Sequence, residues 1–237
     1  NFMGGTNDAQ YIKFGDTGDD DIGSILYYHG NNNMVFTANA SEAMRISGGF
    51  VGIGTSSPLY PIHTTGGDAA LFLQGSTQAR LILQDTGATS GNQAFDIVSV
   101  SDTLKFRSLT DSRGGVNSTA MEINHSGNVG IGVVPEAHHN SHSALQVGGN
   151  GVWTSYKTQG ASGEMDFQHN AYYSQAHGGD RYISTDEATK YRQGGGAHQW
   201  YTAGSGSADS AISWTTAMTI DNAGKLTIPA RAFEVGT

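Results

Sequence analysis

One short phrase, written three times along the chain, restricts its fold more than any other feature. It reads AMRISGGFVGIG at 43–54 and AMEINHSGNVGIG at 120–132, and a diverged copy, AMTIDNAGKLTIP, occupies 217–229. Each copy predicts a short strand, a turn that contains glycine and a second short strand. Because internal repetition is typical of stacked architectures, the phrase favours repetitive β-structure over a fold built around one pocket.

The spacing of the copies predicts whole repeated modules. Met44 and Met121 are 77 residues apart (121 minus 44), and Pro58 and Pro135 have the same separation (135 minus 58). The step from Met121 to Met218 is longer, at 97 residues (218 minus 121), so the third module contains extra material. We therefore predict modules over 1–66, 67–148 and 149–237, with an insertion at 168–198.

Further strands are predicted upstream of each phrase. QYIKFGDTG at 10–18 resembles ARLILQDTG at 79–87, and in both an alternating strand runs into a turn. An apolar strand with an aromatic residue precedes each phrase, and these strands are MVFTA at 34–38, LKFRS at 104–108 and HQWYT at 198–202. Each module thus predicts a small meander of strands.

Composition points to an all-β chain that needs a partner. Of the 237 residues 34 are glycine and 14% are charged, and helical periodicity is confined to a short piece near 184–191. Apolar residues make up 37% and occur in short alternating runs, each of which covers one face of a strand. Such modules bury too little surface alone, and we expect association of identical chains to complete the core.

Charge and cysteine content exclude several classes of function. The formal net charge is −9 and the isoelectric point is near 5.3, which argues against nucleic acid and anionic membranes as partners. No apolar run is long enough for membrane insertion, and the absence of cysteine removes disulfides and thiol chemistry. No cofactor is predicted. The chain begins with Asn1, and we expect it to be a piece of a longer protein.

The glycines of the phrase indicate close packing and not a phosphate loop. A dinucleotide fingerprint would continue into a third glycine and a helix, whereas here Pro58 and Pro135 close the segments. Bare glycine faces let another backbone approach, which we expect to be that of a neighbouring chain. The predicted repeat and trimer-core residues are Met44, Ile46, Val51, Gly52, Ile53, Gly54, Met121, Ile123, Val129, Gly130, Ile131, Gly132, Met218, Ile220, Leu226 and Ile228.

The same segments resemble the GNVGIGT-x-x-P motif of bacteriophage tail fibres and related virus appendage proteins. The matching residues are GNVGIG at 127–132 with Pro135, and VGIGT at 51–55 with Pro58. The resemblance implies elongated, β-prism-like modules intertwined in a parallel homotrimer. It also implies a structural and adhesive role on the virion, outside cells, with other tail or fibre proteins and a host-surface glycan or protein as partners. Bacterial trimeric adhesins carry related glycine-rich motifs, so a bacterial extracellular adhesin or filament subunit is an alternative.

The insertion at 168–198 is the predicted recognition region, because it gathers aromatic residues among glycines and polar groups. Exposed tyrosine and tryptophan rings are suited to stacking on sugars or packing on a receptor, although core packing would also use them. The candidates for receptor or glycan binding are Tyr172, Tyr173, His177, Tyr182, Tyr191 and Trp200.

Metal binding and catalysis are weaker alternatives. His138, His139 and His142 could ligate a transition metal, and the acidic run at 16–21 could bind Ca²⁺, but surface histidines and a solvated turn explain both patterns. A tailspike that cleaves polysaccharide would need two carboxylates across the sugar, and the candidates have no diagnostic spacing. We therefore predict no enzyme; the carboxylates considered are Glu164, Asp166, Asp180, Asp186 and Glu187.

Overall fold

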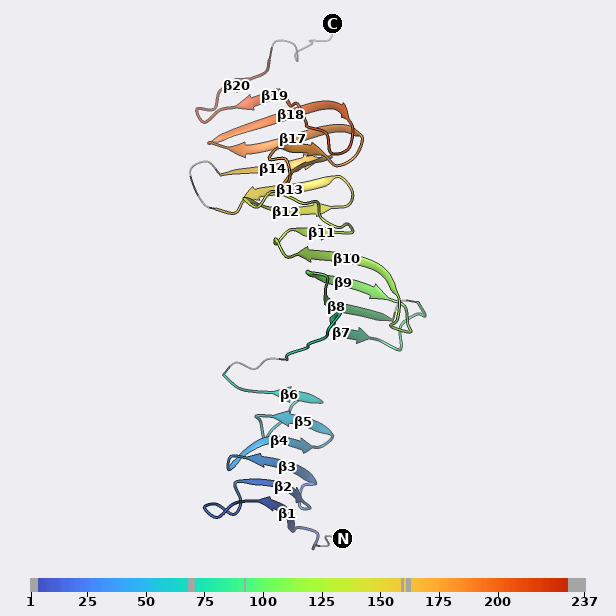
Figure 1. Ribbon diagram of the computed structural model, residues 1–237, viewed down its shortest axis with the longest axis vertical. Helices are drawn as coiled ribbons and strands as arrows, with labels where there is room; N and C mark the ends of the chain where they lie inside the picture. The colour runs from blue at the N-terminus through green and yellow to red at the C-terminus, as the bar shows by residue number, and fades with distance from the viewer. Residues whose placement is uncertain (1–3, 68–70, 92, 159, 161–162, 230–237) are drawn as a thin grey trace. The chain divides into compact units, whose positions relative to one another are not determined.

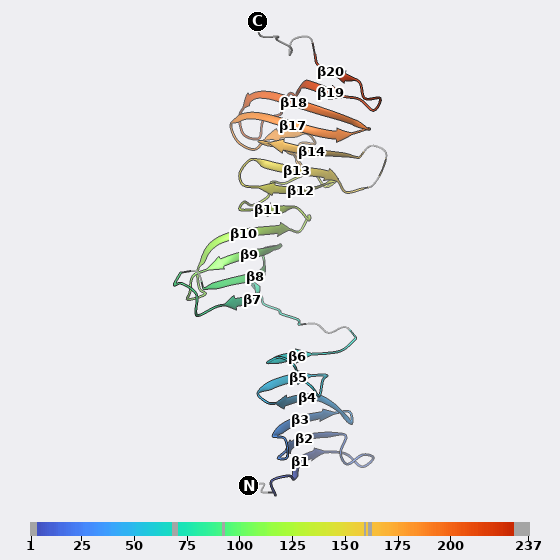
Figure 2. The same cartoon turned by 180° about the vertical axis from the view of Figure 1, so that it is seen from behind.

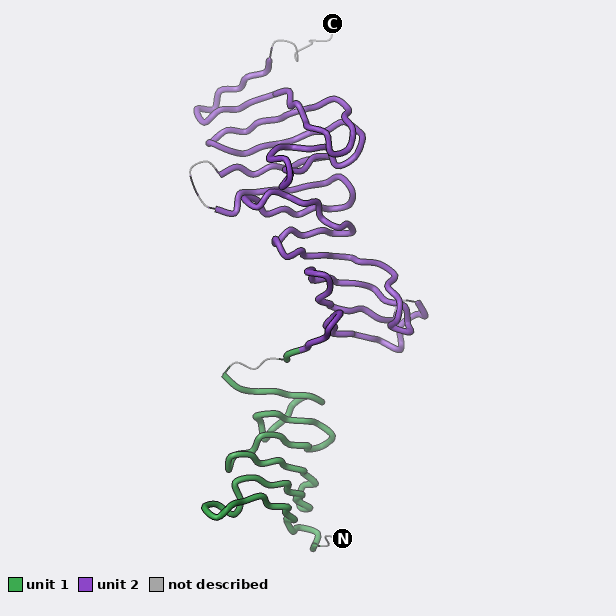
Figure 3. Tube along the Cα trace, in the orientation of Figure 1, with its two compact units in different colours: residues 1–72 green, residues 73–237 purple. Residues whose placement is uncertain are grey.

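The chain forms two compact units, residues 1–72 and 73–237 (Figure 3). The computed structural model describes residues 4–67, 71–91, 93–158, 160 and 163–229. Over these residues it contains strands and no helix, which confirms the all-β prediction. The short helix expected near 184–191 is wrong, because most of that segment belongs to a nine-residue strand, β17 (Asp186–Gly194).

The first unit is a six-stranded sheet in which sequence neighbours are also spatial neighbours (Figure 1). All adjacent pairs are antiparallel except the last, which is parallel. The strands are β1 (Ala9–Phe14), β2 (Gly23–Tyr28), β3 (Asn33–Ala38), β4 (Ser41–Ser47), β5 (Phe50–Ile53) and β6 (Ile62–Thr64).

The second unit is built on a single twelve-stranded sheet, in which the strands follow one another almost in chain order (Figures 1 and 2). The predicted module boundary near residue 148 falls between two of its paired strands, β12 and β13. Its strands are β7 (Ala79–Gln84), β8 (Ala94–Val100), β9 (Thr103–Leu109), β10 (Val116–Asn124), β11 (Val129–Ile131), β12 (His142–Val147), β13 (Gly151–Tyr156), β14 (Glu164–His169), β17, β18 (Ala197–Gly206), β19 (Thr215–Ile220) and β20 (Leu226–Thr227). A separate hairpin consists of β15 (Ala171–Tyr173) and β16 (Asp180–Tyr182).

The three copies of the phrase have the same irregularity in the backbone. In each, the alanine before the methionine is an extra residue that shifts the strand pairing, so it forms a β-bulge. The bulged residues are Ala43, Ala120 and Ala217. The sequence repeat is therefore also a repeat of strand register.

The second glycine of the GIG triplet ends the strand in the first two copies. Gly54 and Gly132 have φ of 72° and 68°. Their N–H groups donate hydrogen bonds to the carbonyl oxygens of the bulged residues, Gly54 to Ala43 at 3.0 Å and Gly132 to Ala120 at 2.9 Å. Such positive φ favours glycine because it has no Cβ. The chain then turns back and adds the next strand in parallel, β6 beside β5 and β12 beside β11.

The first glycine of the triplet is covered by the returning chain. A Cβ on Gly52 would lie 2.5 Å from the carbonyl oxygen of Thr55, and one on Gly130 would lie 2.8 Å from Pro135 Cδ and closer still to the carbonyl oxygen of Val133. A backbone does approach these glycines closely, as expected. It is the backbone of the same chain, which corrects the expectation that a neighbouring chain lies against this face.

Gly130→Ala should therefore destabilise the second unit by about 2 kcal/mol or more, because the added methyl group has to displace backbone atoms. The measurement is the urea unfolding midpoint. Gly149→Ala is the matched control, since a Cβ there meets nothing within 4 Å. Equal midpoints for the two variants would contradict the covered-glycine geometry.

Candidate functional site

Charged residues are segregated on one face of both sheets. In the strands of the two sheets, strand pairing places every Asp, Glu, Lys and Arg on one side, apart from Asp186 and Glu187 at the bulged start of β17. We call this side the charged face. The opposite side, the uncharged face, carries mainly aliphatic and aromatic residues.

In the first unit the uncharged face consists of cross-strand rows of apolar side chains. Strand pairing aligns one row of Ile12, Ile25, Phe36, Met44 and Ile53, and a second of Tyr27, Met34, Ile46, Val51 and Ile62. Ile12 is 45% exposed, Ile53 46% and Ile62 73%. Cross-strand pairs of this kind stabilise a sheet, but here their outer surface has no second layer from the chain's described residues.

In the second unit the corresponding row crosses eleven strands and becomes aromatic toward its C-terminal end. The row consists of Ala79, Ser99, Leu104, Ile123, Val129, Leu145, Trp153, Phe167, Tyr191, Trp200 and Met218. Ring centroids are 5.1 Å apart for Trp153 and Phe167, 6.4 Å for Phe167 and Tyr191, and 4.9 Å for Tyr191 and Trp200. Trp153 and Phe167 remain 45% and 44% exposed.

The aliphatic members of the predicted repeat core lie on the uncharged face, except one. Met44, Ile46, Val51, Ile53, Met121, Ile123, Val129, Ile131, Met218, Ile220 and Leu226 occupy it. Ile228 follows β20 and has no strand partner. Gly52 and Gly130 are in register with the charged face, and Gly54 and Gly132 end their strands.

The charged face is closed by ion pairs and by the chain's own connections. Asp96, whose side chain is fully buried, accepts hydrogen bonds from Arg80 at 2.7 Å and from Arg107 at 3.0 and 2.7 Å. These contacts hold the pKa of Asp96 below its usual value, with the bond from Arg107 as the largest cause. Lys105 pairs with the buried Glu122 at 2.8 Å. These ion pairs all form within the single chain.

The hairpin β15–β16 covers part of the charged face and corrects the prediction of one exposed recognition loop. Within the predicted insertion, Tyr172 and Tyr182 are 6% and 5% exposed. Their hydroxyls donate to Asp209 Oδ1 at 2.8 Å and to the carbonyl oxygen of Gly204 at 2.5 Å. Because both rings and both hydroxyls are engaged inside the chain, these two tyrosines are core residues.

The other four recognition candidates lie on different faces. Tyr173 is half-buried and His177 is exposed, both on the hairpin side. Tyr191 and Trp200 belong to the aromatic row on the uncharged face. The six residues therefore do not form one binding site in the single chain.

The predicted histidine cluster packs against tyrosines. His138 is 2% exposed, its ring meets Tyr172 edge-on at 5.9 Å, and neither ring nitrogen has a hydrogen-bond partner among the described residues. His139 and His142 pack on Tyr173 at 5.3 and 4.9 Å. These contacts dock the segment after Pro135 onto the hairpin, where the N–H of His139 donates to the carbonyl oxygen of Tyr173 at 2.8 Å.

The ligand atoms of the three histidines do not converge as a metal site would require. Over the described ranges, the one trio of potential ligand side chains within 4.8 Å of one another is Asp19, Asp20 and Asp21, all exposed. Asp21 pairs with Lys13 at 3.2 Å. Asp16 accepts the N–H groups of Gly18 and Asp19, which lowers its pKa and forms a tight acidic turn.

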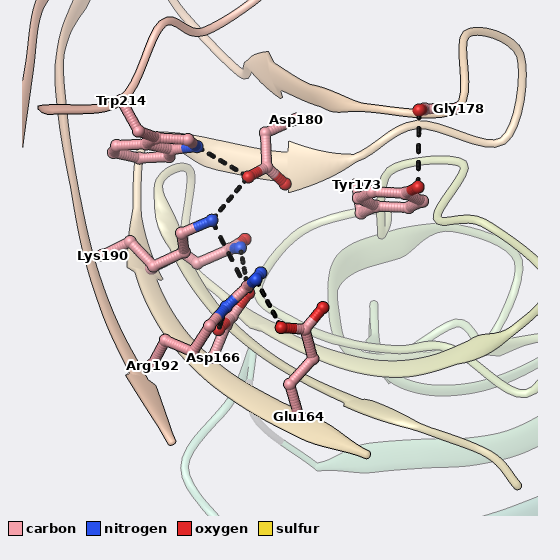
Figure 4. A network of polar contacts seen from close by, with 9 residues as sticks. Glu164, Asp166, Tyr173, Gly178, Asp180, Lys190, Arg192 and Trp214 are labelled. Atoms are coloured by element: carbon pink, nitrogen blue, oxygen red, sulfur yellow. Dashed lines mark hydrogen bonds and ion pairs between the residues drawn. The ribbon is translucent and has the colours of Figure 1, made fainter. Parts of the chain in front are cut away.

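Three of the carboxylates considered for catalysis are held in ion pairs (Figure 4). Asp166 accepts two hydrogen bonds from Arg192, at 2.8 and 2.7 Å, and Glu164 also pairs with Arg192. Asp180 accepts a hydrogen bond from Lys190 at 2.7 Å. Asp186 and Glu187 are exposed at the start of β17. Of these pairs, the one between Asp180 on β16 and Lys190 on β17 joins the hairpin to the sheet.

Comparison with known proteins adds no relative: no family model matches the chain and no curated protein matches it. In the part of the chain that the structure describes, no helix has the length and apolar character needed to cross a membrane.

Segregation of charge was the main feature that sequence reasoning missed. The signal was present within each strand, where charged residues occupy alternate positions; they are Arg80, Asp96, Lys105, Arg107 and Glu122. Whether the charged positions of neighbouring strands lie on the same face depends on the pairing register, which the sequence alone does not give.

His138 should make stability depend on pH. Burial is the main cause that lowers its pKa from 6.5 to about 4, and nearby His142 adds to it. Because the unfolded chain binds this proton more readily, stability is lost as the pH falls from about 6.5 toward 4. We expect a loss of about 3 kcal/mol from this group.

His138→Phe keeps an aromatic ring against Tyr172 and removes the titration. Denaturant unfolding of both proteins at pH 7, 5.5 and 4 is the measurement. The wild type should lose more stability than the variant, and parallel pH profiles would contradict a buried neutral His138.

Proposed function

We propose that the chain is a structural and adhesive segment of a viral tail fibre, in which repeated β modules associate as a parallel homotrimer. The observation that carries the proposal is the uncharged face that each of the two sheets has, and that the described parts of the chain leave uncovered. An exposed apolar surface of this extent marks an interaction site.

Identical copies suit this face because it has no charge to match. Twelve strands at about 4.8 Å spacing make the larger face about 50 Å long, and two rows of side chains give it about 15 Å of width. The product, roughly 750 Å² per copy, approaches the area of about 800 Å² that each partner buries in a specific interface. Three sheets that turn these faces inward would share one apolar core and expose their charged faces.

The viral assignment is supported by the resemblance of the GNVGIG phrase at 127–132 and of VGIGT at 51–55 to fibre motifs. Three symmetric copies would present every outward loop three times, so weak contacts to a host glycan or protein would gain avidity. Other tail or fibre proteins would be the remaining partners. The protein would act outside cells, as part of the virion.

The proposal assigns no catalytic role. Asp166 and Asp180 are engaged by Arg192 and Lys190, whereas a glycosidase pair has to be free to meet a sugar between its carboxylates. A bacterial adhesin would use the same trimer interface and differs in its origin and anchoring.

The oligomeric state tests the interface. Light scattering after size exclusion should give three times the chain mass of 24.9 kDa. Phe167→Glu places a charge on the uncharged face and should abolish the trimer, because a buried unpaired carboxylate is too costly. Ala176→Glu adds the same charge on the exposed hairpin and should leave the trimer intact. A folded wild-type monomer would contradict the shared core.

Adhesion should depend on the exposed hairpin and not on the buried tyrosines. The segment between β15 and β16 presents His177 to solvent. In binding of the labelled protein to a glycan array and to bacterial cells, His177→Ala should weaken binding about tenfold, the loss of one good contact of about 1.4 kcal/mol. Ser56→Ala, on an exposed loop of the first unit, is the control. Unchanged binding of the His177 variant would exclude this hairpin as the recognition element.

A further inference from the structure

An amine and a carboxyl group are enclosed together under the hairpin β15–β16. The side chain of Lys190, on β17, is 4% exposed, and that of Asp180, on β16, is 10% exposed. Lys190 Nζ lies 2.7 Å from Asp180 Oδ2 and 3.9 Å from Oδ2 of Asp166, so it sits between the two carboxylates (Figure 4).

Aromatic and apolar groups surround this pair. The Trp214 and Tyr201 rings lie 4.7 and 5.2 Å from Lys190 Nζ. The neighbouring core consists of Ala171, Tyr182, Ala188 and Ala203, with Ile212 and Trp214 packed against it. Burying two charges in such surroundings costs several kcal/mol per ion before their attraction offsets it. Loss of both charges together would remove this desolvation cost.

The two oxygens of Asp180 have different surroundings. Oδ2 accepts a hydrogen bond from Trp214 Nε1 at 2.6 Å as well as the bond from Lys190. Oδ1 is buried and has no hydrogen-bond partner among the described residues. Leaving a buried carboxylate oxygen without a hydrogen bond costs free energy. Oδ2 is therefore the oxygen that two donors hold in place, and Oδ1 is the oxygen that is free to leave.

We propose that Lys190 and Asp180 form an intramolecular amide bond. The bond forms between Lys190 Nζ and Asp180 Cγ, and the bond from Cγ to Oδ1 breaks. The ammonium group gives up two of its three protons, which leave with Oδ1 as one water molecule. The two opposite charges disappear together, nothing is oxidised or reduced, and no further reactant is needed.

The neighbouring groups have defined parts in this step. Trp214 Nε1–H holds Oδ2, which becomes the amide carbonyl oxygen and carries the negative charge while the bond forms. Asp166 is oriented by its two hydrogen bonds from Arg192, and its Oδ2 lies 3.9 Å from Lys190 Nζ. It would have to approach to hydrogen-bond distance to take a proton from the ammonium and pass it to Oδ1. Fixed proximity in a site without bulk water replaces the activation that such a condensation needs in solution.

The bond would fasten β16 to the main sheet through a covalent link. The hairpin would then stay on the charged face even where its hydrogen bonds open. This inference does not depend on the oligomeric state, because all the groups belong to one chain.

Intact-mass spectrometry of the denatured full chain tests the bond. The expected mass is below that of the sequence by one water molecule. After trypsin digestion, the peptide that contains Asp180 should be joined by the new bond to the peptide that contains Lys190. Cleavage after Lys190 should also be lost, because trypsin does not cleave after an acylated lysine. A wild-type mass equal to that of the sequence overturns the proposal, whether or not the protein is a trimer.

Three variants locate the chemistry. Lys190→Arg should have its full sequence mass, which separates the bond from dehydration elsewhere. Asp180→Asn should lose one ammonia molecule in place of water, since an amide leaving group replaces the hydroxyl. Asp166→Asn keeps both reacting groups and should slow or prevent the mass loss. A complete mass loss in the Lys190→Arg protein would refute the assignment, and complete bond formation in the Asp166→Asn protein would exclude the proton relay.

Discussion

The separation of charged from uncharged residues onto opposite faces of single-layer sheets is the constraint on which the rest of the structure depends. A strand alternates its side chains, so one face can be closed by the chain's own ion pairs and loops while the other receives only apolar groups. Asp96 with Arg80 and Arg107 on the charged face, and Phe167 with Tyr191 on the uncharged face, are the two outcomes of this alternation. The charged face finds ion-pair partners within one chain, and the uncharged face has no covering layer from the described residues.

The bulge and the glycines of the repeated phrase serve this arrangement. The carbonyl oxygens of the bulged residues, Ala43 and Ala120, accept hydrogen bonds from the N–H of the second glycine in each triplet. The first glycine has no Cβ, so the chain can return close to it across the charged face. The return adds a parallel strand after a short connection, whereas parallel strands usually need a crossover of a dozen residues or more. Glycine at these positions therefore makes a compact crossover possible on the face that does not need a partner.

The strand content and the shared face of the apolar residues in the repeated phrase were predictable, because both depend on local alternation and turn chemistry. Met44 and Ile46 share a face by spacing alone. Whether the tyrosines of the insertion are buried or exposed was not predictable, because tyrosine suits both a core strand and an exposed loop. Tyr172 became a core residue through its contact with His138 and its bond to Asp209, partners that are distant in sequence. The expected helix near 184–191 failed for the same reason, since pairing of β17 with β14 and β18 overrides local preference.

The two faces also divide the functions that we infer. Groups on the uncharged face, such as Trp153 and Phe167, can gain burial only from outside the described chain, so they suit assembly. Lys190 on the charged face and Asp180 on the hairpin that covers it are already enclosed, so they suit the covalent link that we propose. Recognition is then left to residues that neither face uses, the exposed connections such as the one that carries His177. Because these connections extend from strands fixed on both sides, their sequence can change without disturbing either the assembly surface or the enclosed ion pairs.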